Sequence, residues 1–220
     1  MPRRPTIRSR NNYYHITARS NNREYFYLPI SNVWNIMTSK LADIQNRLSI
    51  KISAFVLMNN HFHLLILTPK EDIDRVMYFF MKEVTFEIQK STGRINKIFG
   101  GRYKACLIDN WSYLINVYKY IYRNPIESSL SNQAEAYHYS TLYFSVNKKV
   151  QLPFKLDKFS LPHIFEGQRY GDELKWINQK YGAKESASIK CGLHKTRFAY
   201  KKDRISNQPI KPLDKYQNQD

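Results

Sequence analysis

The sequence predicts an α+β protein: a ferredoxin-like antiparallel sheet with helices packed on it, followed by a basic C-terminal extension. The first observation is the order of periodic segments, which runs strand, helix, strand, strand, helix, strand, helix. The second is composition, because 42% hydrophobic and 15% aromatic residues exclude a disordered chain. We therefore expect a domain over residues 1–150, including a basic arm at 1–11, and an extension of unknown structure at 151–220.

The first two elements are a strand and a helix. The strand is expected over residues 13–18, whose β-branched and aromatic side chains favour extended backbone. Ser31 is expected to cap the helix, because apolar residues recur after it at helical spacing. These residues are Val33, Ile36, Met37, Leu41 and Ile44.

A hairpin, a second helix and a further strand follow. Residues 52–58 and 61–67 are expected to pair, because the intervening Asn-Asn dipeptide tolerates the positive φ of a tight turn. The second helix is expected to run from Ile73 to just before Gly93, where apolar spacing ends. Residues 103–108 are expected to form a further strand.

The third helix is expected to begin near Trp111, with Asp109 or Asn110 as its cap. It is expected to stop at about Asn124, because Pro125 disfavours α conformation in the residue before it. Beyond residue 150 the periodicity weakens. A short helix over 172–181 is expected there, and the stretch 195–220 is expected to be mobile.

Charge predicts a polyanionic partner. The chain has 35 Lys+Arg against 18 Asp+Glu, a net charge of +17, and an excess this large favours nucleic acid over a merely basic surface. Cys106 and Cys191 lie in neither a disulfide framework nor a zinc spacing. No apolar run approaches the ~18 residues of a membrane span. We expect a cytoplasmic protein without membrane contact.

Two histidines stand at the head of the strand expected over 61–67. Successive strand side chains point to opposite faces, so His61 and His63 share a face while Phe62 takes the other. This geometry would allow the two imidazoles to bind one metal ion. Because strand histidines are also often plain polar side chains, further residues have to decide between the two interpretations.

The third helix carries the side chains able to complete such a site. Asn116, Tyr120 and Asn124 are each four residues apart and fall along one helical face. Tyr118 and Tyr122 are displaced by about 200° from Tyr120. A phenol and an amide oxygen one turn apart are thus able to face one metal. Spacing alone leaves open which tyrosine acts, because tyrosines also pack with their hydroxyls toward solvent.

This set of groups suits phosphodiester transesterification. A divalent cation held by two imidazoles and an amide oxygen polarises a phosphate oxygen, and a tyrosine attacks phosphorus. A free phenol has a pKa of ~10, so it needs a base or the field of a metal to react at neutral pH. No carboxylate in the sequence is an evident base.

The chain resembles the single-tyrosine HUH transposases, particularly their REP-associated tyrosine transposase branch. The matching blocks cover about residues 12–145 in the expected order. They are Tyr14-His15-Ile16-Thr17-Ala18-Arg19 with Asn22-Arg23, Met58-Asn59-Asn60-His61-Phe62-His63-Leu64-Leu65, Gly101-Arg102-Tyr103-Lys104, and Tyr120-Ile121-Tyr122-Arg123-Asn124-Pro125-Ile126.

The resemblance implies that His61 and His63 are metal ligands, that Tyr120 is the nucleophile and that Asn124 is the third ligand. It implies Mg²⁺ or Mn²⁺ as the cofactor. It also implies cleavage of single-stranded DNA beside a hairpin similar to a repetitive extragenic palindrome, through a 5′-phosphotyrosine that leaves a 3′-hydroxyl for later strand joining. By the same resemblance we expect a monomer.

Two departures from the family pattern stand out. Asn59 replaces the usual proline of Met-Pro-Asn, and the usual Asn-Pro-Val-(Arg/Lys)-Ala block becomes Asn-Pro-Ile-Glu-Ser at 124–128, losing a basic residue. DNA contacts are therefore sought elsewhere. The candidates for phosphate contact are Arg3, Arg4, Arg8, Arg10, Arg19, Arg102 and Lys104, and those for base stacking are Tyr103 and Trp111.

Two other functions fit parts of the pattern. A non-cleaving module that binds hairpin or single-stranded nucleic acid would share the charge and the aromatic residues. A replication-initiator-type HUH nickase would share the chemistry, but such enzymes commonly have a third histidine. We expect no suitably placed third histidine near His61 or His63.

Overall fold

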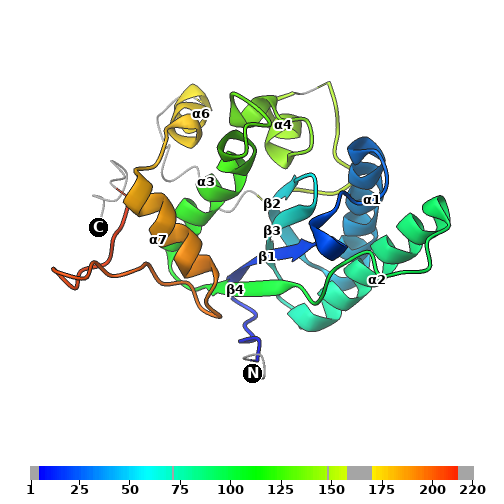
Figure 1. Ribbon diagram of the computed structural model, residues 1–220, viewed down its shortest axis with the longest axis horizontal. Coiled ribbons are helices and arrows are strands. Elements are labelled where there is room, and N and C mark those ends of the chain that lie inside the picture. The colour runs from blue at the N-terminus through cyan, green and yellow to red at the C-terminus, as the bar shows by residue number, and fades with distance from the viewer. Residues whose placement is uncertain (1–4, 71, 148, 158–169, 213–220) are drawn as a thin grey trace.

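The computed structural model describes residues 5–70, 72–147, 149–157 and 170–212. A four-stranded antiparallel sheet, in the order β2-β3-β1-β4, lies between two helical layers (Figure 1). The strands are β1 (Tyr13–Arg19), β2 (Lys51–Leu57), β3 (His61–Leu67) and β4 (Lys104–Ile108). Helices α1 (Ile30–Leu48) and α2 (Ile73–Thr92) cover one face, and α3 (Trp111–Glu127) covers the other. The predicted ferredoxin-like α+β class is confirmed.

Shorter elements complete the two layers. They are η1 (Asn21–Arg23), η2 (Ala134–Ala136), α4 (Thr141–Val146), α6 (Tyr170–Asn178) and α7 (Ala183–Leu193). In Figure 1 the last two helices lie on the α3 side of the sheet, away from α1 and α2. No helix in the described part of the chain is long and apolar enough to cross a membrane.

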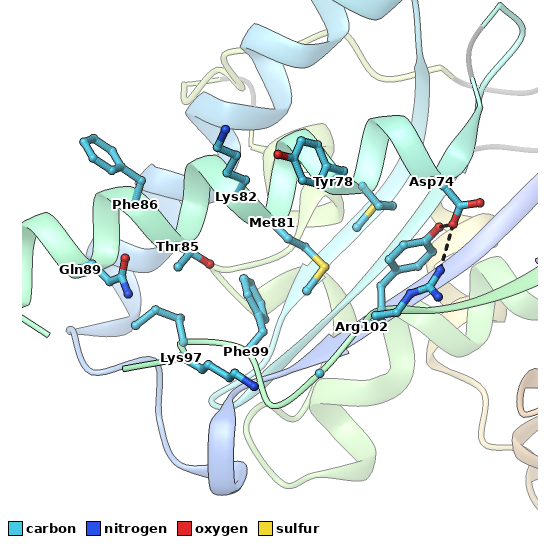
Figure 2. A pocket seen from close by; sticks show the side chains of 14 residues that line it. Asp74, Tyr78, Met81, Lys82, Thr85, Phe86, Gln89, Lys97, Phe99 and Arg102 are labelled. Atoms are coloured by element: carbon cyan, nitrogen blue, oxygen red, sulfur yellow. Dashed lines mark hydrogen bonds and ion pairs between the residues drawn. The ribbon is translucent and has the colours of Figure 1, made fainter. Parts of the chain in front are cut away.

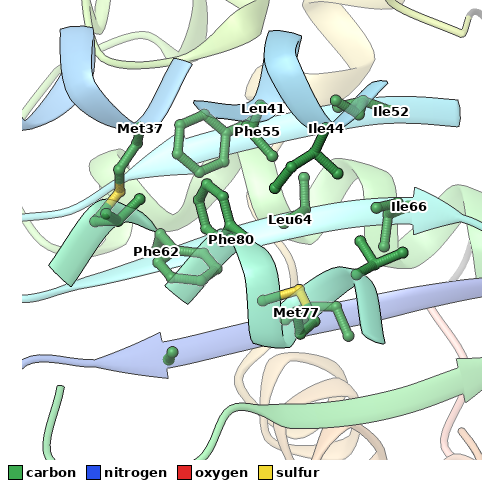
Figure 3. Packing of buried hydrophobic residues seen from close by; sticks show 14 of the residues in the cluster. Met37, Leu41, Ile44, Ile52, Phe55, Phe62, Leu64, Ile66, Met77 and Phe80 are labelled. Carbon is green, nitrogen blue, oxygen red and sulfur yellow. The ribbon is translucent and has the colours of Figure 1, made fainter. Parts of the chain in front are cut away.

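Alternation along β3 divides its side chains between the two layers. Phe62 is fully buried on the side of α1 and α2, where its ring meets that of Phe80 edge-on with centroids 5.5 Å apart. Figure 3 shows these rings among the aliphatic side chains that the two helices contribute. Leu65 lies in the opposite cluster, under α3. The histidines, at positions of the same parity as Leu65, therefore face α3.

The first two helices begin and end for different local reasons. α1 starts at Ile30 behind Pro29, and no side chain caps it, so the expectation that Ser31 is its cap is wrong. The carbonyl of Pro29 accepts from the N–H of Val33, 3.2 Å away, so the first turn is closed by backbone groups without help from a side chain. α2 follows the sequence prediction and ends at Gly93, whose φ of 69° is a left-handed cap.

The third helix continues past Pro125, contrary to the expected stop at Asn124. Proline has no N–H, so the carbonyl of Ile121 lacks its usual helical donor. The Asn124 side chain supplies a substitute: its Nδ2 donates to the carbonyls of Tyr120 (2.8 Å) and Ile121 (3.3 Å). At the other end Asn110, one of the two predicted caps, accepts from the N–H of Ser112.

The hairpin between β2 and β3 forms as predicted but with a different backbone. The N–H of Met58 donates to the carbonyl of His61 at 2.8 Å, which closes the turn. Neither Asn59 nor Asn60 has a positive φ, so the expected left-handed conformation is absent from this turn. The backbone of Asn60 is instead held by the N–H of Ser20, 2.9 Å from its carbonyl oxygen.

The C-terminal extension packs on the α3 layer over the part that the structure describes. Residues 196–198 pair with β4, and the N–H of Phe198 donates to the carbonyl of Leu107 at 2.8 Å. Phe198 and Tyr200 are buried, so residues 196–200 are packed against the α3 layer, contrary to the expected mobility. Residues 201–211 are mostly exposed, and 213–220 lie outside the described residues. The short helix expected at 172–181 is α6. The domain boundary after residue 150 stays a prediction.

Replacing Gly192 by alanine is expected to destabilise the protein by about 1–3 kcal/mol. An added Cβ would lie 2.8 Å from a ring carbon of Phe198 and 3.0 Å from the carbonyl oxygen of Ala199. Urea unfolding measures the effect. Gly182→Ala is the control, because its Cβ meets only the flexible carboxylate of Glu185, and it is expected to cost under about 1 kcal/mol. Equal losses in the two variants would contradict the packing described.

Candidate active site

Each histidine of β3 uses one ring nitrogen within the protein. The Nδ1–H of His61 donates to Oδ1 of Asn60 at 2.8 Å, and Nδ1 of His63 lies 2.9 Å from Nε2 of His15. Nε2 of His63 is buried and has no hydrogen-bond partner among the described residues. An imidazole held through Nδ1 with an unsatisfied Nε2 is the arrangement of a metal ligand with its outer hydrogen-bond partner.

His15 is a third histidine beside this pair, but its ring is bonded to His63, so the expectation that no third histidine is suitably placed stays a prediction. His15 belongs to β1, and its ring stacks on that of His63 with centroids 5.1 Å apart. His15 lies opposite Leu65 in the register, and Thr17 lies opposite His63. Since its Nε2 is already bonded to His63, His15 is placed to orient the ring of His63.

All three imidazoles are neutral at pH 7. Burial, reinforced by neighbouring positive groups, lowers the pKa of His15 to about 3 and that of His61 to about 4. Burial also lowers the pKa of His63 well below its usual value. A metal ligand has to be a neutral imidazole with a lone pair, so these environments suit cation binding.

Tyr120 is the tyrosine of α3 that faces the histidines. Its ring meets those of His63 and His15 edge-on, with centroids 6.0 and 6.4 Å away. Burial, with a smaller effect from Glu127, raises the pKa of the phenol to about 12. The resting group is therefore neutral, and it becomes a nucleophile only if its proton is removed in the field of a cation or by a base.

The neighbouring tyrosines have structural roles. Tyr118 and Tyr122 pack edge-on against each other with ring centroids 4.7 Å apart. The hydroxyl of Tyr122 lies 2.8 Å from Oγ1 of Thr141, and that of Tyr118 donates to Glu173 on α6 at 3.2 Å. Their separation from Tyr120 agrees with the angular displacement predicted from the sequence.

The asparagines of the predicted stripe differ from each other. Asn116 is fully buried and accepts from the hydroxyl of Tyr181 at both of its oxygens, so it joins the packing against the extension. Asn124 is partly exposed one turn beyond Tyr120, and its Nδ2 is committed to helix carbonyls. The remaining atom, Oδ1, is therefore the one available to a cation.

The residues present fit a divalent cation through mixed donors. Among the described residues no group of three His, Cys, Asp or Glu side chains is arranged to hold a metal. Two imidazoles with the orphaned Nε2 of His63 supply part of a ligand shell. An amide oxygen from α3 supplies a hard donor of the kind that Mg²⁺ and Mn²⁺ accept.

Basic side chains flank the histidines on the same face of the sheet. Arg19 lies opposite His61 in the β1–β3 register, and Lys104 lies opposite Thr17 in the β1–β4 register. Opposed residues of an antiparallel pair point to one face, so both cations share the face of the histidines. Both are exposed, which leaves them available to phosphate.

The other proposed DNA contacts are more scattered. Arg8 and Arg102 pair with Asp74 at the start of α2 (3.1 and 3.4 Å), and the hydroxyl of Tyr103 donates to the same carboxylate. Arg10 is exposed on the N-terminal arm. Trp111 is exposed at the start of α3, about 13 Å along the helix from Tyr120. Arg3 and Arg4 lie outside the described residues.

Sequence reasoning missed two residues of the site, His15 and Asn60. Each lay within a quoted block, but neither had been given a role. Asn60 directly precedes His61, and an amide beside a ligand is a recognisable signal for an outer hydrogen-bond partner. His15 carried no such signal, because its contact with His63 spans 48 residues.

Comparison with known proteins agrees with this fold. A family model described as transposase, IS200 like, matches residues 8–124, just over half of the chain. The chain belongs to the family of IS200-like transposases. No curated protein matches it.

Two solved structures are similar. One is a REP-associated tyrosine transposase bound to a REP hairpin, with a TM-score of 0.53 and 19% identity, covering 73% of this chain and 94% of that one. At this identity the similarity supports the fold alone. A protein from Deinococcus radiodurans has a TM-score of 0.38 and 15% identity over 55% of this chain and 94% of its own, and it adds nothing to the argument.

The roles assigned to the tyrosines predict a difference in stability. Tyr122→Phe removes a buried hydroxyl bonded to Thr141 and is expected to cost about 1–2 kcal/mol in the free energy of unfolding. Tyr120→Phe is expected to change it by less than about 0.5 kcal/mol, because its hydroxyl has no hydrogen bond within the described part of the chain. Urea unfolding followed by circular dichroism measures both. A large loss in Tyr120→Phe would show a structural role for that hydroxyl.

Proposed function

We propose that this protein is a metal-dependent endonuclease and strand transferase that acts on single-stranded DNA beside hairpins through a 5′-phosphotyrosine. The observation that carries the proposal is the contact of Tyr120 with the His15–His63 pair, since His63 has an unsatisfied Nε2. A nucleophile and a cation site thereby share one face of the sheet. Family membership and the net charge of +17 support DNA as the substrate.

In this proposal His61 and His63 hold Mg²⁺ or Mn²⁺ through Nε2, and Asn124 contributes Oδ1. The cation, when bound, neutralises charge on a non-bridging phosphate oxygen and favours the phenolate. Asn60 and His15 orient the two imidazoles through their Nδ1 atoms. Arg19 and Lys104 hold the neighbouring phosphates of the strand.

The proposed reaction is a balanced transesterification. Oη of Tyr120 loses its proton to water and forms a bond to phosphorus, while the bond from phosphorus to the 3′-oxygen breaks. The 3′-oxygen takes a proton from water and leaves as a hydroxyl. The phosphotyrosine retains the energy of the phosphodiester, so attack by a 3′-hydroxyl reverses the step and joins strands.

A hairpin as the recognised element rests on similarity of fold. The solved relative is described as bound to a REP hairpin, and we extend this class of ligand to the present chain as part of the proposal. The initiator-type alternative gains no support from His15, because that ring is bonded to His63 instead of being open to a metal. We also expect a cytoplasmic monomer.

Replacing the proposed nucleophile tests the reaction. Tyr120→Phe is expected to abolish the covalent adduct with single-stranded hairpin DNA in Mn²⁺, because the ring of Tyr120 meets those of His63 and His15. Adducts are measured as protein–DNA bands in denaturing gels. Tyr113→Phe is a matched control on the same helix and should retain the adduct. An adduct in Tyr120→Phe, or none in the wild type while hairpin binding persists, would refute the proposal, and the latter would favour a non-cleaving binding module.

Removing the orienting amide tests the cation site. Asn60→Ala is expected to weaken Mn²⁺ binding by about 10- to 100-fold, because His61 loses the acceptor that fixes its ring. Asn59→Ala removes the neighbouring amide of the same turn and should bind Mn²⁺ as the wild type does. Titration calorimetry on the protein without DNA gives the affinity. Equal Mn²⁺ affinity in the two variants would show that Asn60 does not support a ligand.

A further inference from the structure

A groove of about 860 Å³ lies on the opposite helical layer from the histidines, between α2 and the segment leading into β4. In Figure 2, Tyr78, Lys82 and Phe86 follow one another along α2, while Lys97, Phe99 and Arg102 come from the facing segment. We propose that this groove binds unpaired nucleotides of the DNA strand, with bases on its aromatic residues and phosphates on its cations. The inference rests on the proposed function only in taking single-stranded DNA as the substrate.

The apolar side chains of the groove suit stacking. Tyr78 and Phe86 are 58% and 62% exposed, on a helix whose other large apolar side chains are mostly buried. They project from the same side of α2 about two turns apart, at a separation of eight residues or about 12 Å along its axis. Exposed aromatic rings on one helix face are a platform for successive bases, because every base presents a π-face.

The base of the groove is rigid. Phe99 is only 7% exposed, and its ring meets Phe62 and Phe26 edge-on with centroids 6.3 and 5.8 Å away. The adjacent Gly100 is tied to β1, since its N–H donates to the carbonyl of Arg19 at 3.0 Å. A fixed aromatic base costs little entropy when a ligand is ordered against it.

The charges around the groove select an anion. Lys82, Lys97 and Arg102 line it, and the single acidic lining residue is Asp74. That carboxylate is already paired with Arg8 and Arg102 at 3.1 and 3.4 Å. An apolar peptide would gain nothing from these cations, whereas a nucleic-acid strand presents bases and phosphates together.

The groove and the proposed active site lie near the same end of β1, on opposite faces of the sheet. The wall formed by residues 98–100 is hydrogen-bonded to Arg19 and Asn21 at the end of β1. Arg19 is opposite His61 in the register, so that end of the sheet carries the proposed metal ligands on its other face. In this inference a DNA strand leaving the active site past Arg19 reaches the groove around the end of β1.

The test uses binding in a Tyr120→Phe background, so that no covalent step contributes. Fluorescence anisotropy is measured with an oligothymidylate of about 12 nucleotides. Tyr78→Ala/Phe86→Ala is expected to weaken binding at least about tenfold. Leu130→Ala/Ile205→Ala, which removes exposed apolar side chains elsewhere, should leave it unchanged. Equal affinities in the two double variants would overturn the inference, as would failure of the starting protein to bind.

Charge reversal tests the phosphate contacts independently. Lys82→Glu/Lys97→Glu is expected to lower the salt dependence of oligothymidylate binding by about 1.4 in the log–log slope, since two phosphate contacts are lost. Lys180→Glu/Lys190→Glu makes the same change in net charge on exposed positions of the extension and should leave the slope closer to that of the parent. Equal slopes in both variants would overturn the assignment.

Two further measurements distinguish nucleotide binding in the groove from DNA binding elsewhere on the protein and from a contact between copies of the chain. Photocrosslinking with 5-iodouracil in the oligonucleotide is expected to label peptides from residues 73–103, and labelling confined to other peptides would overturn the inference. If Tyr78→Ala/Phe86→Ala instead converts a dimer to a monomer with DNA affinity unchanged, the groove is a contact between copies of the chain. Absence of a covalent adduct with the wild type would refute the cleavage chemistry while leaving these binding results intact.

Discussion

The antiparallel pairing of β1 with β3 is the constraint on which the site depends. It places Thr17 opposite His63 and Arg19 opposite His61. The guanidinium-bearing side chain of β1 therefore lies beside an imidazole of β3. The same pairing sends Phe62 into the core under α1 and α2, where it has no exposed surface. A shift of one residue in this register would exchange the histidine and phenylalanine faces, so stability of the core and integrity of the site are set by one register.

Local patterns in the sequence predicted much of this arrangement. Two-residue periodicity placed His61 and His63 on one face, and apolar spacing gave the bounds of α2, because both depend only on near neighbours. The partnership of His15 with His63 could not be predicted in this way, since it depends on pairing across 48 residues. The roles of Tyr120 and Asn124 came from resemblance, and their metal and nucleophile functions remain proposals.

The C-terminal extension is more ordered than its weak hydrophobic periodicity predicts. Arg123 on α3 is 2% exposed, and its guanidinium donates to the carbonyl of Ile177 at 3.2 Å, while Lys119 lies over the rings of Trp176 and Tyr181 at 5.0 and 4.6 Å. From the sequence alone, buried Arg and Lys side chains such as these would be assigned to the surface. Their partners come from the short helix α6 and the segment that follows it, neither of which would be stable alone, so the order arises from tertiary contact with α3.

The bonding at the end of α3 couples two residues that a sequence comparison would treat separately. Asn124 donates to the carbonyl of Ile121 because Pro125 cannot. Any other residue at 125 would return a backbone donor to that carbonyl and leave the amide with its shorter bond, to the carbonyl of Tyr120 at 2.8 Å. The Asn-Pro dipeptide thus acts as one structural unit, because the missing N–H of the proline leaves the carbonyl of Ile121 free to help hold the amide of Asn124.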